Sequence, residues 1–332
     1  MSIAAVIWHH TLSANSSLPL AAQGYQGVTL FFVISGFLIV TLILREQDVT
    51  GAVSVRNFYV RRVLRIWPLY FAVLMTYVLV VLLLEKDANA RAQFFRNLPY
   101  FATFTSNIFS KLDSPRVIFY FAWSLAAEQQ FYLVWPWIER WQKGRGGLIA
   151  AIAAVVAATV LSLAGYQVVS FVAAIGMGVV LAHLLHRPQS FAWMSRLFGQ
   201  PGMVFATATS VLAALSAGSV LGPLQEPLLN LLLASLVAAS VIPPFADLGE
   251  RTYLRPVIWF GVVSYGVYLV HMLAVNIVRK VEGVAHIQSP VIDFLGGLLL
   301  AFAIATLSYH YYEKRFLALK KRFFVSRPPE YR

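Results

Sequence analysis

Long apolar stretches separated by short polar segments run along the whole chain. Most of these stretches approach the ~20 residues that a helix needs to cross a bilayer. The pattern predicts an all-α protein, a polytopic membrane helix bundle with about ten transmembrane helices. The expected spans cover residues 1–13, 27–44, 66–84, 118–138, 148–164, 167–185, 202–220, 228–246, 257–278 and 291–312.

The first of these stretches is short. Met1–Thr11 would cover only about half of a bilayer. We therefore expect either a helix that enters the membrane obliquely or a truncated first helix in a chain that starts late.

Composition agrees with this membrane class. Of the 332 residues, 59% are hydrophobic and 12% are charged, whereas soluble domains average about 45–50% apolar residues. The spans use nearly the whole length, and no repeat or linker divides it, so we expect a single domain over residues 1–332. The chain contains no cysteine, which excludes a disulfide, a thiolate metal site and a cysteine nucleophile.

The basic residues predict the orientation. With the N-terminus inside, 19 of the 26 Lys and Arg residues fall in cytoplasmic segments. The positive-inside rule therefore favours cytoplasmic placement of both termini. Because lipid headgroups and orientation explain the net charge of +12, we expect membrane lipids, and no nucleic acid, as partners. The longest outward segment, Glu85–Val117, is apolar over Phe94–Phe109, and we expect that part at the interface or folded into the bundle.

A carboxylate lies inside the apolar segment Trp123–Pro136. A charge at this depth costs roughly 2.5–3.5 kcal/mol and is usually paired or turned toward a cavity. Ser124, Glu128 and Tyr132 are four residues apart, so they form one polar stripe on a helix. Glu128 is either a structural carboxylate bonded to a neighbouring helix or an acid/base group.

Two histidines follow the first apolar turn. A neutral imidazole takes a proton from a hydroxyl near neutral pH, so His9 or His10 is a candidate general base. The alternative is an interfacial pair at a helix end. A second stripe, Ser264, Tyr268 and His271, favours hydrogen bonding between helices. No histidine has a metal-ligand pattern, and we expect no metal.

Three arginines, Arg61, Arg62 and Arg65, stand just before a span at helical spacing. They anchor the span at the cytoplasmic surface, and guanidinium groups also bind phosphates, such as those of a coenzyme A donor. Ser35-Gly36 lies in an apolar helix, where small residues allow close helix packing. Ser35 as an acyl-accepting nucleophile is the alternative.

Four motifs together resemble the acyltransferase family 3 membrane proteins, the O-antigen and exopolysaccharide O-acetyltransferase type. They are GVTLFFVISGFLI (27–39), FYVRRVLRIWPLY (58–70), WSLAAEQQFYLVWP (123–136) and SYGVYLVH (264–271), in the family's order. With the ten spans, the likeness covers essentially the whole chain. It implies a ten-helix acyltransferase domain in a bacterial inner membrane.

The resemblance also implies transfer of an acyl group, often acetyl from acetyl-CoA, to a hydroxyl of a glycan or a lipid-linked sugar. The family's first span carries an arginine, ten intervening residues and a histidine, and His10 matches that histidine. The arginine would fall just before Met1, which agrees with a truncated first helix. Two further departures are Thr29, where an acidic residue is common, and the single carboxylate, Glu128, where two are common.

On this interpretation His10 is the general base. Glu128 orients or charge-balances it, or returns a proton to the leaving thiolate, and Arg61, Arg62 and Arg65 bind the donor. His9, Ser35, Ser124, Tyr132 and His271 are supporting polar residues. Two other classes stay open, a small-molecule or glycan transporter with an intramembrane Glu/His relay and an inactive membrane scaffold. The acceptor, the acyl chain length and the oligomeric state are not readable from the sequence.

Overall fold

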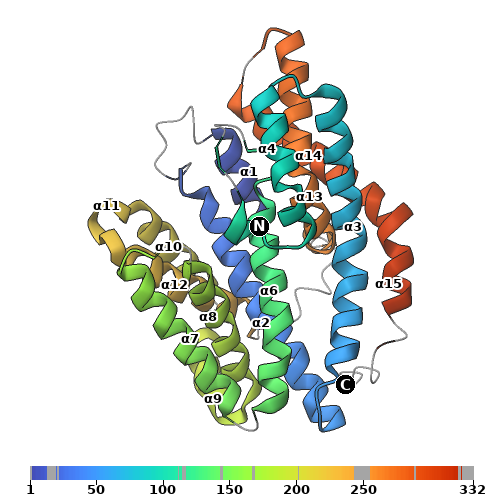
Figure 1. Cartoon of the computed structure of the whole chain (residues 1–332). Coiled ribbons are helices and arrows are strands. Elements are labelled where there is room, and N and C mark those ends of the chain that lie inside the picture. Colours follow the sequence, from blue (N-terminus) through green and yellow to red (C-terminus); the bar gives the residue numbers. More distant parts are fainter. Residues whose placement is uncertain are drawn as a thin grey trace. The chain divides into compact units, whose positions relative to one another are not determined.

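The computed structural model describes residues 2–12, 20, 22–110, 112–113, 117–142, 145–166, 169–200, 202–242, 255–287, 289–320 and 323. Within these residues the protein is helical and contains no strand (Figure 1). The helices belong to two compact units, residues 1–48 with 142–306 and residues 49–141 with 307–332.

Unit 1 contains the first and the last of the four family-like motifs, residues 27–39 and 264–271, and a group of short apolar helices. Its elements are α1 (Ser2–Leu12), η1 (Ala22–Tyr25), α2 (Gln26–Thr50, through Asp48), α7 (Gly146–Leu163), α8 (Ser170–His186), α9 (Pro188–Phe198), α10 (Met203–Ser216), α11 (Gly218–Leu221), η3 (Gly222–Leu224), α12 (Gln225–Val241), α13 (Arg255–Val284) and α14 (Pro290–Ser308, through Thr306).

Unit 2 contains the carboxylate and arginine segments. Its elements are α3 (Val55–Leu84), α4 (Ala88–Ala102), α5 (Ser106–Phe109), α6 (Ala122–Trp141), the π-helical turn η6 (Tyr309–Glu313) and α15 (Lys314–Lys320). In Figure 1 the red helix α15 runs beside the blue helix α3, and the two are in contact.

Each expected span corresponds to a helix, but the bounds and the count differ. Among the described residues, six helical segments could cross a membrane by length and composition, or up to seven if the bent pair α8–α9 is one span. The expected count of about ten is therefore not confirmed. The first helix has only 11 residues and α10 only 14, and α6 is not among the six because polar residues interrupt it.

Two local features account for much of the difference. Arg187 precedes Pro188 and is extended, with φ −95° and ψ 131°, because the proline ring disfavours a helical conformation in the residue before it. The chain bends there by 108°. Further, the predicted outward loop is helical: Asp87 accepts hydrogen bonds from the Asn89 and Ala90 amides and begins α4.

Reciprocal glycines bring α2 and α8 together in unit 1. A Cβ on Gly36 would stand 2.1 Å from the Ile175 carbonyl oxygen, and one on Gly178 would stand 2.0 Å from that of Val33. The backbones can approach this closely only because neither residue has a side chain. The packing role expected of the Ser35-Gly36 pair is thus confirmed for Gly36, and Ser35 is buried beside it.

Unit 2 packs α4 and α6 against α3. The apolar face of α4 buries Phe94 and Phe101, and the Tyr70 hydroxyl of α3 donates to the Phe101 carbonyl at 2.8 Å. Asn107 and Gln130 exchange side-chain hydrogen bonds of 3.1 and 2.8 Å. Phe94–Phe109 was expected at the interface or folded into the bundle, and the burial of Phe94 and Phe101 agrees with folding into the bundle, whereas Phe109 is exposed.

Candidate active site

The carboxylate of Glu128 is buried in the middle of α6. Its residue is 4% exposed, and the Tyr132 hydroxyl, one turn further along the helix, donates a hydrogen bond to Oε1. Ser124, one turn earlier, is completely buried and donates to the Phe121 carbonyl at 3.2 Å. The three side chains therefore form the buried polar stripe that their spacing predicts, and the tyrosine hydrogen bond stabilises a carboxylate that burial would otherwise disfavour.

A cation from α3 joins this stripe. The Arg62 guanidinium carbon lies 5.6 Å from the ring centroids of both Phe58 and Tyr132, within the range of a cation–π interaction. It is also within electrostatic reach of Glu128. Arg62 Nε is buried and finds no hydrogen-bond partner among the described residues. Since an unsatisfied buried donor costs about 1–3 kcal/mol, this nitrogen is suited to an anionic ligand.

Further cations surround Arg62. Arg61 and Arg65 stand on the same helix, and Lys320 of α15 lies within electrostatic reach of all three arginines. The Arg61 Nη1 atom donates to the Phe323 carbonyl at 2.9 Å, which links the α3 segment to the end of the chain beyond α15. We call Arg61, Arg62, Arg65 and Lys320 the cation cluster.

Two carboxylates offset part of this charge. Glu128 faces Arg62, and Glu313 of η6 lies within reach of Arg65 while accepting a 3.3 Å hydrogen bond from Ser308. Four cations and two anions leave a positive balance. Guanidinium and ammonium groups in such an arrangement bind phosphate oxygens well.

The histidines form a separate group in unit 1. The His10 ring lies 5.5 Å from the His271 ring, and 5.5 Å from the His9 ring, between centroids. His271 is completely buried, and its Nδ1 donates to the Tyr268 carbonyl, because a carbonyl can only accept. In the neutral ring this tautomer leaves Nε2 as an acceptor. His10 is exposed, so the pair extends from the surface of the unit into its interior.

The family model described as an acyltransferase domain matches residues 1–310. The chain belongs to acyltransferase family 3. Its apolar helices and this family make it an integral membrane protein, as the sequence motifs predicted.

Two relatives show which kind of family member the chain resembles. The chain is 27% identical over 350 residues to the "Putative peptidoglycan O-acetyltransferase YrhL" of Bacillus subtilis, with 94% of this chain and 54% of the relative aligned. It is 29% identical over 151 residues to the "Peptidoglycan O-acetyltransferase OatA" of Listeria monocytogenes, covering 41% of this chain and 22% of the relative. The chain thus spans about half of YrhL. No solved structure matches it significantly.

The predicted site residues of this acyltransferase-family chain fall into two groups. Unit 2 brings together Ser124, Glu128 and Tyr132 with the three arginines, and unit 1 brings together His9, His10 and His271. Ser35 is buried next to Gly36 at the α2–α8 glycine contact. His10 and Glu128 belong to different units, and their predicted partnership stays a prediction.

One residue of the cation cluster escaped the sequence reasoning. Lys320 counted only as one of several basic residues near the C-terminus, yet it joins arginines more than 250 positions earlier in the chain. No local pattern links α15 to α3, so only the fold could reveal the contact. The described residues contain no group of three or more His, Asp or Glu side chains that could hold a metal ion.

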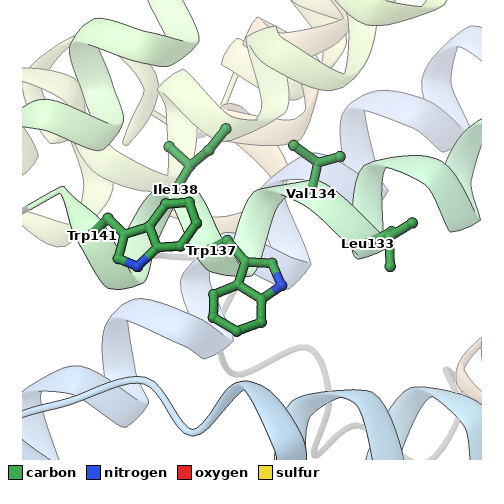
Figure 2. Close-up of a pocket in the computed structure, with 5 residues that line it drawn as sticks. All are labelled: Leu133, Val134, Trp137, Ile138 and Trp141. Atoms are coloured by element: carbon green, nitrogen blue, oxygen red, sulfur yellow. The ribbon is translucent and has the colours of Figure 1, made fainter.

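An apolar cavity of about 400 Å³ lies along the C-terminal half of α6. Figure 2 shows that its lining, Leu133, Val134, Trp137, Ile138 and Trp141, comes from this one helix. Trp137 and Trp141 pack with ring centroids 5.4 Å apart, and both are exposed. With no titratable group in the lining, this surface suits contact with apolar material such as acyl chains of lipid, rather than chemistry.

Proposed function

We propose that the protein is an O-acyltransferase that moves an acetyl group from acetyl-CoA to a hydroxyl of a glycan or a lipid-linked sugar. Family membership supports the reaction class, and the names of YrhL and OatA support a glycan acceptor. The observation that carries the proposal is the buried Glu128–Tyr132–Arg62 group, whose arginine belongs to the cation cluster.

The donor binds at the cation cluster in this proposal. Coenzyme A carries a diphosphate and a ribose phosphate, and bidentate arginine contacts recognise phosphate oxygens. The buried Arg62 nitrogen without a partner supports direct contact with one of these phosphates. The positive-inside pattern supports a cytoplasmic position for this site and for both termini, in a bacterial inner membrane.

His10 acts as the general base. It removes the proton from the acceptor hydroxyl as the oxygen attacks the thioester carbonyl, and the C–S bond then breaks to release the coenzyme A thiolate. The proton passes to that thiolate, so the products are the ester and free coenzyme A. His271, fixed in one tautomer by Tyr268, lies behind His10 and orients or polarises its ring.

Glu128 contributes negative charge to the same reaction. It balances the imidazolium that forms on His10, or it delivers the proton to the leaving thiolate. Its hydrogen bond from Tyr132 and its proximity to Arg62 hold the carboxylate in place on α6. A direct transfer of this kind needs no acyl-enzyme, which agrees with the absence of cysteine.

An ester-forming assay tests the proposal. Membranes containing the protein receive acetyl-CoA labelled in its acetyl group, and label is followed into glycan and lipid fractions. We expect alkali-labile label that depends on His10 and Glu128. Full transfer by both His10→Ala and Glu128→Gln would contradict the assigned residues. A transporter, the alternative class, would move label across sealed vesicles without forming a new ester.

A further inference from the structure

The C-terminal end of α1 is held by a residue from a distant helix. A helix leaves its last four carbonyl groups without intrahelical partners, and α1 ends at Leu12. The Arg279 Nη2 atom of α13 donates a hydrogen bond to the His10 carbonyl at 2.9 Å. The cation also complements the partial negative charge at that helix end.

The same guanidinium is fixed from a second side. Its Nε donates to Asp293 Oδ2 at 2.9 Å, and Asp293 is buried in the first turn of α14. The Asp293 amide in turn donates to the Ser289 carbonyl at 2.9 Å, and the Glu282 carboxyl of α13 lies within electrostatic reach of Asp293 and Arg279. Because the guanidinium is planar, the hydrogen bond from Nε to Asp293 fixes the plane in which Nη2 donates to the His10 carbonyl.

Apolar packing also holds this part of α1: Ile7 and Leu12 are buried, and the His9 ring lies 6.0 Å from the Tyr25 ring between centroids. The helix has only 11 residues, and Trp8 packs edge-on against Phe294 of α14 with ring centroids 5.2 Å apart. His10 itself is exposed on one side and meets His271 on the other. The position of its imidazole therefore depends on where the backbone at residue 10 is held, and Arg279 bonds that backbone directly.

We propose that Arg279, fixed by Asp293, is a positioning residue for acetyl transfer that holds the α1 backbone so that the His10 imidazole stays against His271. This rests on the proposed function for the role of His10. Misplacing a reacting group by about 1 Å costs on the order of 100-fold in rate, so a lost anchor lowers turnover. The proposed function assigns donor binding to Arg61, Arg62, Arg65 and Lys320 and not to Arg279, so we expect a change at Arg279 to alter turnover and not KM for acetyl-CoA.

The kinetic test separates turnover from binding. In Arg279→Gln we expect kcat to fall at least 10-fold while KM for acetyl-CoA stays within 2-fold of the wild-type value. Arg279→Lys retains one cationic donor and should recover part of the loss, and added guanidinium ion should partly restore Arg279→Ala. The control is Lys280→Gln, which removes the neighbouring exposed cation and should leave kcat unchanged. An unchanged kcat in Arg279→Gln, or an equal loss in Lys280→Gln, overturns the proposal.

A structural readout makes the test independent of activity. The chain has no cysteine, so Trp8→Cys with Phe294→Cys creates one thiol pair between α1 and α14. A short bifunctional thiol reagent should cross-link this pair efficiently, and adding Arg279→Gln should lower the yield several-fold, whereas adding Lys280→Gln should not. An unchanged yield overturns the proposal. A wild-type protein that forms no ester overturns the proposed function instead, and the cross-linking still decides whether Arg279 holds α1.

Discussion

The Tyr132 hydroxyl donates a hydrogen bond to the buried carboxylate of Glu128, one turn away on α6. The Arg62 guanidinium carbon lies 5.6 Å from the ring centroid of the same tyrosine. Tyr132 thus contacts both the candidate acid/base group and the candidate donor-binding cation. The tyrosine therefore connects the arginine motif of α3 with the glutamate motif of α6, which are separate in the sequence.

Removing the Tyr132 hydroxyl should weaken catalysis more than folding. Hydrogen bonds to charged groups contribute about 1.5–3 kcal/mol, so Tyr132→Phe should lower kcat by roughly 10- to 100-fold. Steady-state transfer kinetics in detergent or membranes measure the effect. Tyr59→Phe is the matched control, because the Tyr59 hydroxyl of α3 donates to the backbone carbonyl of Leu133 at 2.6 Å and touches no catalytic candidate. Equal losses in the two variants would mean that only helix packing was disturbed.

Lys320 should affect the donor and not the chemical step. Lys320→Gln removes one cation from the cluster around Arg62, and we expect KM for acetyl-CoA to rise roughly 3- to 10-fold with kcat nearly unchanged, because uniform binding is lost. Lys314→Gln, at the exposed start of the same helix, should leave both parameters unchanged. A fall in kcat at constant KM would place Lys320 in a different role.

Adding a methyl group at the α2–α8 contact should destabilise unit 1. Gly36→Ala forces its Cβ against the Ile175 carbonyl, and overpacking of this kind costs about 1–3 kcal/mol. Thermal or denaturant unfolding in detergent measures the change. Gly261→Ala has open space around its Cβ and should be neutral or slightly stabilising, since alanine is the better helix former. Similar unfolding midpoints for the two variants would contradict the close contact.

The apolar pattern predicted the helices well but not their capacity to span a membrane. A run such as Gly146–Leu163 is helical and long, as its composition requires. The expected span over residues 167–185 is likewise helical as α8, and the chain bends at Arg187, before Pro188 begins α9. The segment after Leu84 looked like a loop because its polar residues are frequent, yet α4 forms there with a buried apolar face. This helix is in contact with α3.

The candidate site was predictable only where it is local. Ser124, Glu128 and Tyr132 share a helix, so their spacing alone predicted the buried stripe. The arginine triplet of α3 was visible for the same reason. Lys320 and Arg279 were not, because each acts on residues hundreds of positions away, through helices whose packing no short pattern records.

A double-mutant cycle tests most directly whether His10 and Glu128 serve one active site. Rates of acetyl transfer are measured for wild type, His10→Ala, Glu128→Gln and the double variant, after size-exclusion chromatography has confirmed that each is folded. Residues that act as a unit are non-additive. We predict that each single change lowers kcat by about 100-fold or more, within the range typical of acid/base groups. The kcat of the double variant should be no lower than the kcat of the less active single variant. Losses that multiply, or full activity in either single variant, would contradict a shared site.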